Sequence, residues 1–218
     1  MLTFSVYSKQ ETFKEFYMTP LWLETHASYI DNFSVIAADQ ITFHAGSTDH
    51  ALLLRIPLVE AGLLEDGTPL NVEITAANDV SIGQSSDSDP RYGVSDGTNF
   101  IGFHTVDQGN YDGKQFFYPC HGLQATSGKA LTGKEVFDKT SPTQVAKFYP
   151  DQFVFTFKLD KSWGSCFTAH GGGFIKTVNY TKQLFLSQGI FLEVYKAHKT
   201  EKVGIKYIEV IVRKTGSY

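Results

Sequence analysis

Aromatic side chains in this sequence repeatedly stand beside glycine, asparagine or aspartate, the residues that form turns and loops. A ring in such a loop can stack on the apolar face of a sugar, while nearby carboxylate, amide and guanidinium groups bond to the hydroxyls. The same rings could equally cover the ends of a hydrophobic core, and the sequence leaves both roles open. The predicted ligand-binding residues are Asp89, Arg91, Tyr92, Asn99, His104, Tyr111 and Trp163.

Aspartates in the same part of the chain suggest a second chemistry, the binding of a cation. Residues 107–113 partly align with an EF-hand loop, but Pro119 stands where the bidentate glutamate is required. An EF-hand is therefore excluded. Aspartates of this kind also serve ordinary turns. Calcium is the one cofactor that the sequence leaves open, with Asp87, Asp89, Asp107 and Asp112 as its predicted ligands.

Two motifs resemble parts of hydrolase active sites but lack the required context. The segment from Gly93 to Gly97 matches the G-x-S-x-G nucleophile elbow, yet residues 98–103 have the pattern of a strand instead of a helix. The His170-Gly-Gly-Gly segment follows this motif, whereas a lipase oxyanion segment precedes it. A retaining glycosidase needs two carboxyls about 5–5.5 Å apart, and Glu193 stands alone on its predicted strand. The sequence favours a protein that is not an enzyme. A catalytic pair of carboxylates from two separate strands remains the alternative.

The elements that must position these residues are strands. Residues 153, 155, 157 and 159 are large and apolar and alternate with other residue types, which predicts a half-buried strand at 153–159. Residues 12–17 are expected to form a short helical turn. Further strands are predicted at 33–37, 41–44, 51–59, 70–76, 189–195 and 204–213, the last two as a terminal hairpin.

The segment from Tyr92 to Phe103 has the pattern of a β-hairpin. Asp96-Gly97 between β-forming residues predicts a type I′ turn with both of these residues at its centre. Gly93 and Gly102 in the flanking strands indicate bulges or a close approach of other atoms to the backbone.

Strand alternation and the spacing of turns predict an all-β protein with at most short helices. The 218 residues suit one domain, residues 1–218, and 42% hydrophobic residues suffice for a large core. We expect an antiparallel β-sandwich of the jelly-roll type. Within it, residues 107–147 are expected to be an irregular, loop-rich segment.

The Tyr92–Phe103 segment and the strands at 190–195 and 204–212 resemble the concanavalin A-like jelly-roll sandwiches. That group includes lectins, laminin-G-like modules and SPRY domains. The resemblance implies a two-sheet sandwich that binds glycans or peptides. It covers about half of the chain, without a diagnostic motif, and the E-x-D-x-x-E signature of the group's glucanases is absent.

Cysteines and sequons bear on the compartment. A disulfide between Cys120 and Cys166 would be worth roughly 4 kcal/mol on the chain-entropy model. The sequons at Asn32 and Asn179 favour glycosylation and an extracellular location. Because no signal peptide is visible, two free thiols in a cytoplasmic protein are the alternative.

Charge and hydropathy restrict the kinds of partner that this protein can bind. Lysines are scattered and the isoelectric point is near 6.0, so a nucleic-acid partner is excluded. No apolar run is long enough to span a bilayer. The sequence favours a non-enzymatic carbohydrate-binding module of lectin type. A structural or self-assembling β-sandwich that binds a protein surface is the alternative, a glycoside hydrolase on a jelly-roll scaffold is third, and the oligomeric state is left open.

Overall fold

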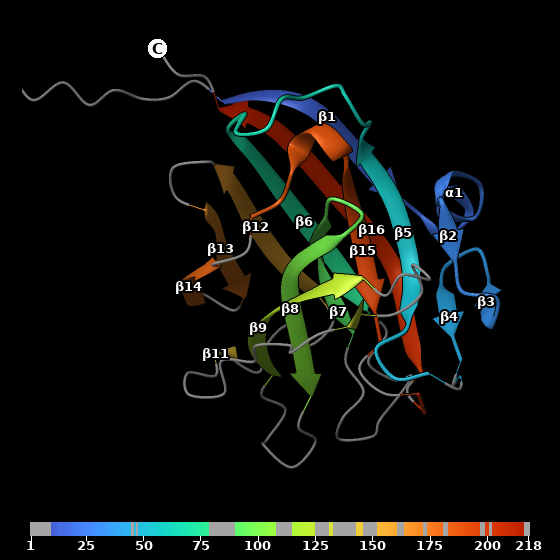
Figure 1. Cartoon of the computed structure of the whole chain (residues 1–218). Coiled ribbons are helices and arrows are strands. Elements are labelled where there is room, and N and C mark those ends of the chain that lie inside the picture. The colour runs from blue at the N-terminus through green and yellow to red at the C-terminus, as the bar shows by residue number, and fades with distance from the viewer. Residues whose placement is uncertain are drawn as a thin grey trace, which may run out of the picture.

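The chain folds into two antiparallel sheets that pack face to face, a β-sandwich of the jelly-roll type, as its computed structural model shows (Figure 1). This confirms the predicted fold class. The structure describes residues 10–44, 46, 48–78, 90–107, 115–124, 131–132, 143–145, 152–160, 164–171, 174–180, 183–196, 199–200 and 202–215.

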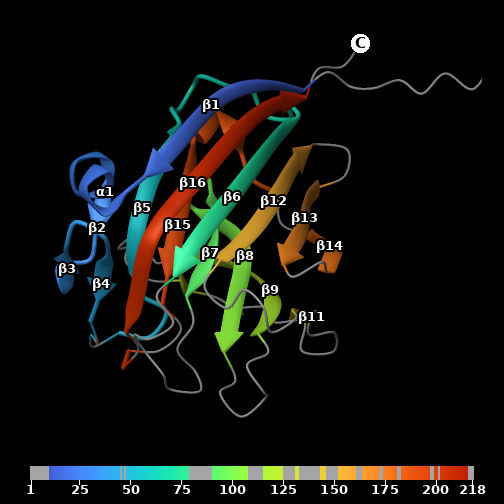
Figure 2. The ribbon, with the colours of Figure 1, turned by 180° about the vertical axis from the view of Figure 1, so that it is seen from behind.

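The first sheet, sheet A, has the strand order β14-β13-β12-β6-β16-β4-β3, and β1 also pairs with β16. Figure 2 shows β1, β16, β6 and β12 side by side. The strands of sheet A are β1 (Gln10–Met18), β3 (Ser34–Ile36), β4 (Ile41–Phe43), β6 (Leu70–Asn78), β12 (Gln152–Asp160), β13 (Gly164–Gly171), β14 (Phe174–Tyr180) and β16 (Val203–Thr215).

The second sheet, sheet B, has the order β10-β9-β8-β7-β15-β5-β2, and β11 pairs with β9. Its strands are β2 (Tyr29–Ile30), β5 (Leu52–Val59), β7 (Arg91–Ser95), β8 (Asn99–Asp107), β9 (Gln115–Gln124), β10 (Leu131–Thr132), β11 (Thr143–Val145) and β15 (Ile190–Tyr195). The described parts of residues 107–147, a segment expected to be irregular, thus include β9, β10 and β11.

Helices are short, as predicted. Helix α1 (Pro20–His26) begins after Thr19, whose hydroxyl accepts a hydrogen bond from the Trp22 N–H at 3.3 Å. The 3₁₀ helix η1 spans Leu186–Gln188. The helical turn expected at residues 12–17 is wrong, because this segment lies in β1, where a register shift after Thr12 interrupts the alternation. In the described part of the chain, no helix has the length and apolar character to cross a membrane.

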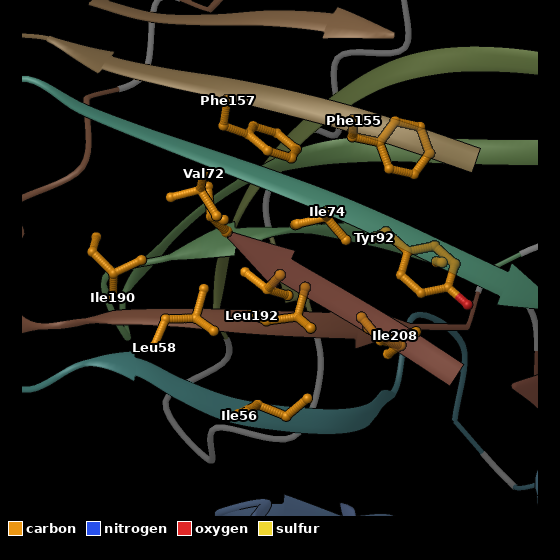
Figure 3. Packing of buried hydrophobic residues seen from close by; sticks show 14 of the residues in the cluster. Ile56, Leu58, Val72, Ile74, Tyr92, Phe155, Phe157, Ile190, Leu192 and Ile208 are labelled. Atoms are coloured by element: carbon orange, nitrogen blue, oxygen red, sulfur yellow. The ribbon is translucent and has the colours of Figure 1, made fainter. Parts of the chain in front are cut away.

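The hydrophobic core lies between the two sheets, and Figure 3 shows side chains of both meeting there. Phe155 and Phe157 of β12 are fully buried, and the Phe155 ring stacks on the Tyr92 ring with centroids 6.4 Å apart. Burial of each large apolar side chain contributes about 1.5–3 kcal/mol. The predicted alternation is therefore confirmed for Phe155, Phe157 and Leu159, which lie on the inward face of this strand.

The last two strands, β15 and β16, are present where they were predicted, but they do not form a hairpin. β15 pairs with β5 and β7 in sheet B, whereas β16 pairs with β1, β4 and β6 in sheet A. The intervening residues 196–202 carry the chain from one sheet to the other. Each strand therefore occupies an interior position in a different sheet.

The predicted hairpin at Asp96-Gly97 is confirmed, while its turn type is wrong. Gly97 has a positive φ of 89°, but Asp96 has not, and the Asp96 N–H donates to the Asn99 carbonyl at 3.2 Å. Gly97 and Thr98 are therefore the two central residues, one position later than predicted. A type I′ turn would need a positive φ at both of them, and Thr98 does not have one.

Gly93 and Gly102 face each other directly across β7 and β8. The register of these strands is unbroken, so neither glycine marks a bulge. A Cβ atom would lie 2.6 Å from the Phe100 Cζ atom at Gly93 and 2.5 Å from it at Gly102. The Phe100 ring thus covers both glycines, which confirms the predicted close approach.

Candidate functional site

Three loops meet at one end of the sandwich, and this group is called the loop pole: residues 60–69, 96–98 and 183–189. The Gly62 N–H donates to the Ser187 carbonyl at 2.9 Å, and the Ser187 N–H donates to Asp66 Oδ1 at 2.8 Å. Figure 1 shows the β5–β6 loop near the top of the molecule, with η1 below it. These bonds join the first and third loops into one surface.

Asp96 links the hairpin turn to the third loop. Asp96 is 2% exposed. Oδ1 accepts from the N–H groups of Thr98 at 2.9 Å and Asn99 at 2.7 Å, and Oδ2 accepts from Asn99 Nδ2 at 2.9 Å and the Phe185 N–H at 3.0 Å. Hydrogen bonds to an ionised acceptor are roughly twice as strong as neutral ones. Asp96 therefore joins the hairpin turn to the third loop through four hydrogen bonds.

The surface of the loop pole combines apolar and polar groups. Phe185 is 42% exposed and Leu63 is 49% exposed. The side chains of Thr98, Ser187 and Gln188, which belong to the same group of loops, are exposed as well. An exposed ring with hydroxyl and amide groups on preformed loops can stack on a ligand ring and bond to its polar edge.

A second polar group lies on the outer face of sheet B, away from the main core. Glu193 of β15 is fully buried and accepts hydrogen bonds from Arg55 Nε at 2.8 Å and from the Tyr195 hydroxyl at 2.5 Å. Ser95 of β7 also bonds to this carboxyl. The Arg55 guanidinium lies over the Phe191 ring, 5.5 Å from its centroid. We call Arg55, Ser95, Glu193 and Tyr195 the carboxylate cluster.

Burial dominates the electrostatics of the carboxylate cluster. It raises the pKa of Glu193 above its ordinary value, although the Arg55 charge and the hydrogen bonds of Tyr195, Arg55 and Ser95 act in the opposite direction. A buried carboxyl with a raised pKa is the kind of group that can act as a general acid. With no exposed surface, however, it has no direct access to solvent in this structure.

Two of the predicted ligand-binding residues, Arg91 and His104, are brought together by the register of β7 and β8, and Tyr195 flanks Arg91 on β15. Arg91 is 2% exposed, and its Nη1 donates to His50 Nδ1 at 2.7 Å and to the Lys196 carbonyl at 3.3 Å. Arginine only donates, so this ring nitrogen of His50 is the acceptor. Arg91 thus ties the ends of β7 and β15 to residue 50.

Tyr92 and Asn99, also predicted to bind a ligand, have structural roles here. The Tyr92 ring is fully buried against Phe155 and offers no exposed platform. Asn99 is 7% exposed and donates to Asp96 beneath the loop pole. The remaining predicted positions lie outside the described residues: Asp89, Tyr111, Trp163 and the side chain of His104.

The calcium site stays a prediction. Asp107 ends β8, with its side chain outside the described part of the structure, and Asp87, Asp89 and Asp112 lie entirely outside it. The described residues contain no group of three or more side chains that could hold a metal ion.

The disulfide and the glycosylation sites also stay predictions. Cys120 lies on β9 of sheet B, opposite Gly102, whereas Cys166 lies on β13 of sheet A, opposite Lys158. Asn32 is exposed in the turn before β3, and Asn179 lies on β14.

Comparisons with known proteins were made for the whole chain. No family model matches it, and no curated protein does. Among solved structures, peanut lectin bound to a peptide has a TM-score of 0.49 at 9% identity, covering 97% of this chain and 100% of that one. β-Agarase A from Zobellia galactanivorans has a TM-score of 0.47 at 10% identity, covering 87% and 83%. An endo-1,3-β-glucanase from Streptomyces sioyaensis has 0.46 at 11%, covering 84% and 79%. Values this low say nothing about the function of this chain.

Proposed function

We propose that this protein is a carbohydrate-binding module of lectin type that binds sugar at the loop pole. The observation that carries the proposal is the half-exposed ring of Phe185, whose backbone N–H is bonded to the buried Asp96 carboxylate. Loops that are already ordered lose little conformational entropy when a ligand binds. The pole is therefore suited to a ligand that offers few contacts, such as one or two sugar rings.

The side chains of the loop pole divide into binding and positioning groups. Phe185 offers a stacking surface, and the Thr98 and Ser187 hydroxyls offer hydrogen bonds to sugar hydroxyls. Asp96 acts as a positioning residue, because its oxygens are already bonded to N–H groups of the pole. The exposed carboxylates of Glu65 and Asp66 favour a neutral sugar over an anionic one.

A glycan array tests this proposal. The wild-type protein should bind a subset of neutral glycans, Phe185→Ala should weaken that binding about tenfold, and Phe185→Trp should retain it. Leu21→Ala is the matched control, because Leu21 is an exposed apolar residue of α1 outside the pole. The proposal fails if the wild type binds no glycan, with or without calcium, or if the Phe185→Ala and Leu21→Ala variants bind equally well.

The carboxylate cluster favours an enzyme as the second candidate function. Burial raises the pKa of Glu193, as a general acid of a glycoside hydrolase requires, although the hydrogen bond from Tyr195 acts in the opposite direction. Because Glu193 is fully buried here, this role also requires a conformation that exposes its carboxyl to the substrate. Turnover of model polysaccharides that disappears in Glu193→Gln and in Tyr195→Phe would support this candidate. Loss of turnover only in proportion to loss of folded protein would leave Glu193 with a structural role.

A further inference from the structure

Two tyrosine rings lie together on the outer face of sheet A, the side opposite to the core. The rings of Tyr17 and Tyr207 have centroids 5.7 Å apart and planes inclined by 30°. Tyr17 is 61% exposed, the most exposed of the large aromatic side chains in the described residues, and Tyr207 is half-buried. Their strands, β1 and β16, run side by side in Figure 2.

The register explains why these rings meet. Tyr17 stands opposite Glu209, and Tyr207 precedes Glu209 by two residues on the same face of β16. Tyr17 and Tyr207 are therefore diagonal neighbours, a spacing at which large rings still touch. On the other side, Tyr207 stands opposite Ala77 of β6. Ala77 is a small residue, and Tyr207 stays partly exposed beside the largely exposed Tyr17 ring.

Polar groups that suit a neutral ligand surround the ring pair. Glu209 stands opposite Thr75 of β6, and both are partly exposed. Glu15, two residues before Tyr17, is exposed as well, while the exposed Lys206 precedes Tyr207 at a register shift. Further along this face, Glu73 pairs with Arg213 at 3.5 Å. The carboxylates can accept hydrogen bonds from hydroxyls and would repel an anionic polymer.

We infer that Tyr17 and Tyr207 form a carbohydrate platform for a neutral polysaccharide chain, separate from the loop pole. Two neighbouring rings on a sheet face can stack on the sugar rings of an extended chain, because Tyr17 is largely exposed and Tyr207 is partly exposed beside it. Glu209 and Thr75 then bond to the hydroxyls at the edge of those sugars. This site goes beyond the proposed function, since it lies on a sheet face instead of the loops and requires no residue of the loop pole.

Retention on insoluble neutral polysaccharides tests the platform, with microcrystalline cellulose and chitin as the probes. We expect the wild type to sediment with at least one of them. Tyr17→Ala combined with Tyr207→Ala should weaken retention roughly tenfold, and Tyr17→Phe should change it less than twofold, because the stacking face is kept. The substitutions are at the surface, and far-UV circular dichroism with a urea titration shows whether each variant is folded.

The experiment separates this site from the loop pole. Phe185→Ala should leave retention on the solid polysaccharide unchanged, and the double tyrosine variant should leave glycan-array binding unchanged. Affinity electrophoresis in gels containing alginate supplies the anionic comparison, in which the wild type should migrate without retardation. The inference is overturned if neither neutral polymer retains the wild type, if the folded double variant is retained equally well, or if alginate binds more strongly than the neutral polymers.

Discussion

Adding one methyl group at Gly102 should destabilise the fold by driving apart groups that are already in contact. A Cβ atom at this position would lie 2.5 Å from Phe100 Cζ and 2.4 Å from the Tyr92 carbonyl oxygen. Overpacking of this kind costs typically about 1–3 kcal/mol. Replacing glycine in a strand by alanine returns roughly 0.5–1 kcal/mol, because less backbone entropy is lost on folding. We therefore expect Gly102→Ala to lower the free energy of unfolding by up to about 2.5 kcal/mol.

A double-mutant cycle with Phe100→Ala separates the two sources of the clash. Removing the Phe100 ring removes two of the three nearest contacts of the new methyl group and leaves the contact with the Tyr92 carbonyl. Gly102→Ala should therefore cost about 1 kcal/mol less than in the wild-type background. Urea unfolding followed by circular dichroism gives the four free energies. Equal costs in both backgrounds, or a stabilised single variant, would show that the ring does not restrict this position.

Three further predictions concern buried charged groups. Burial raises the pKa of Glu193 above 4.5, so the folded state keeps this proton to higher pH than the unfolded state does. The free energy of unfolding should therefore fall as the pH rises from 4.5 through the folded-state pKa. The slope should be at most about 1.4 kcal/mol per pH unit. Thermal melts across this range should show a shallower decline for Glu193→Gln, and parallel curves would contradict the assignment. Lys196 is 1% exposed, and its ammonium makes one hydrogen bond within the described residues, to the His44 carbonyl at 3.4 Å. Lys196→Met should raise the free energy of unfolding by about 1 kcal/mol in urea titrations, and a clear loss would reveal a further role for the charge. Asp96→Asn places an amide donor among N–H groups and should cost about 1–3 kcal/mol, measured by the same titration; a neutral result would mean that the loop pole does not depend on this carboxylate.

Strands with regular alternation could be predicted from the sequence, because the order of apolar and polar residues in each strand shows which of its faces is buried. Phe155, Phe157 and Leu159 alternate with other residue types, and the structure buries these three while leaving Lys158 exposed. In β1, a register shift after Thr12 breaks the alternation, so the local pattern misled the prediction. Helix α1 did carry a usable signal, since Thr19 and Pro20 have the preferences of an N-cap and a first helical residue.

The candidate sites could be predicted only in part, because they depend on pairings between distant residues. Glu193 looked isolated on its strand, and its partner Arg55 is 138 positions away in the sequence. Nothing local connects Tyr17 with Tyr207, which meet only because β1 and β16 pair. By contrast, the role of Asp96 could be predicted from the sequence, since aspartate before glycine often accepts hydrogen bonds from the backbone N–H groups two and three residues later.

The interior positions of β15 and β16 have a consequence for synthesis of the chain on the ribosome. β15 fills the place between β7 and β5, and β16 fills the place between β6 and the strands β1 and β4. Until residues 190–215 have emerged, each nascent sheet is divided by a missing strand, and the unpaired edges on both sides of each gap can pair with other chains. Nearly the whole domain is therefore synthesised before either sheet can be completed. The two halves of each sheet join in a late step, and a chaperone that shields strand edges would be needed most during this interval.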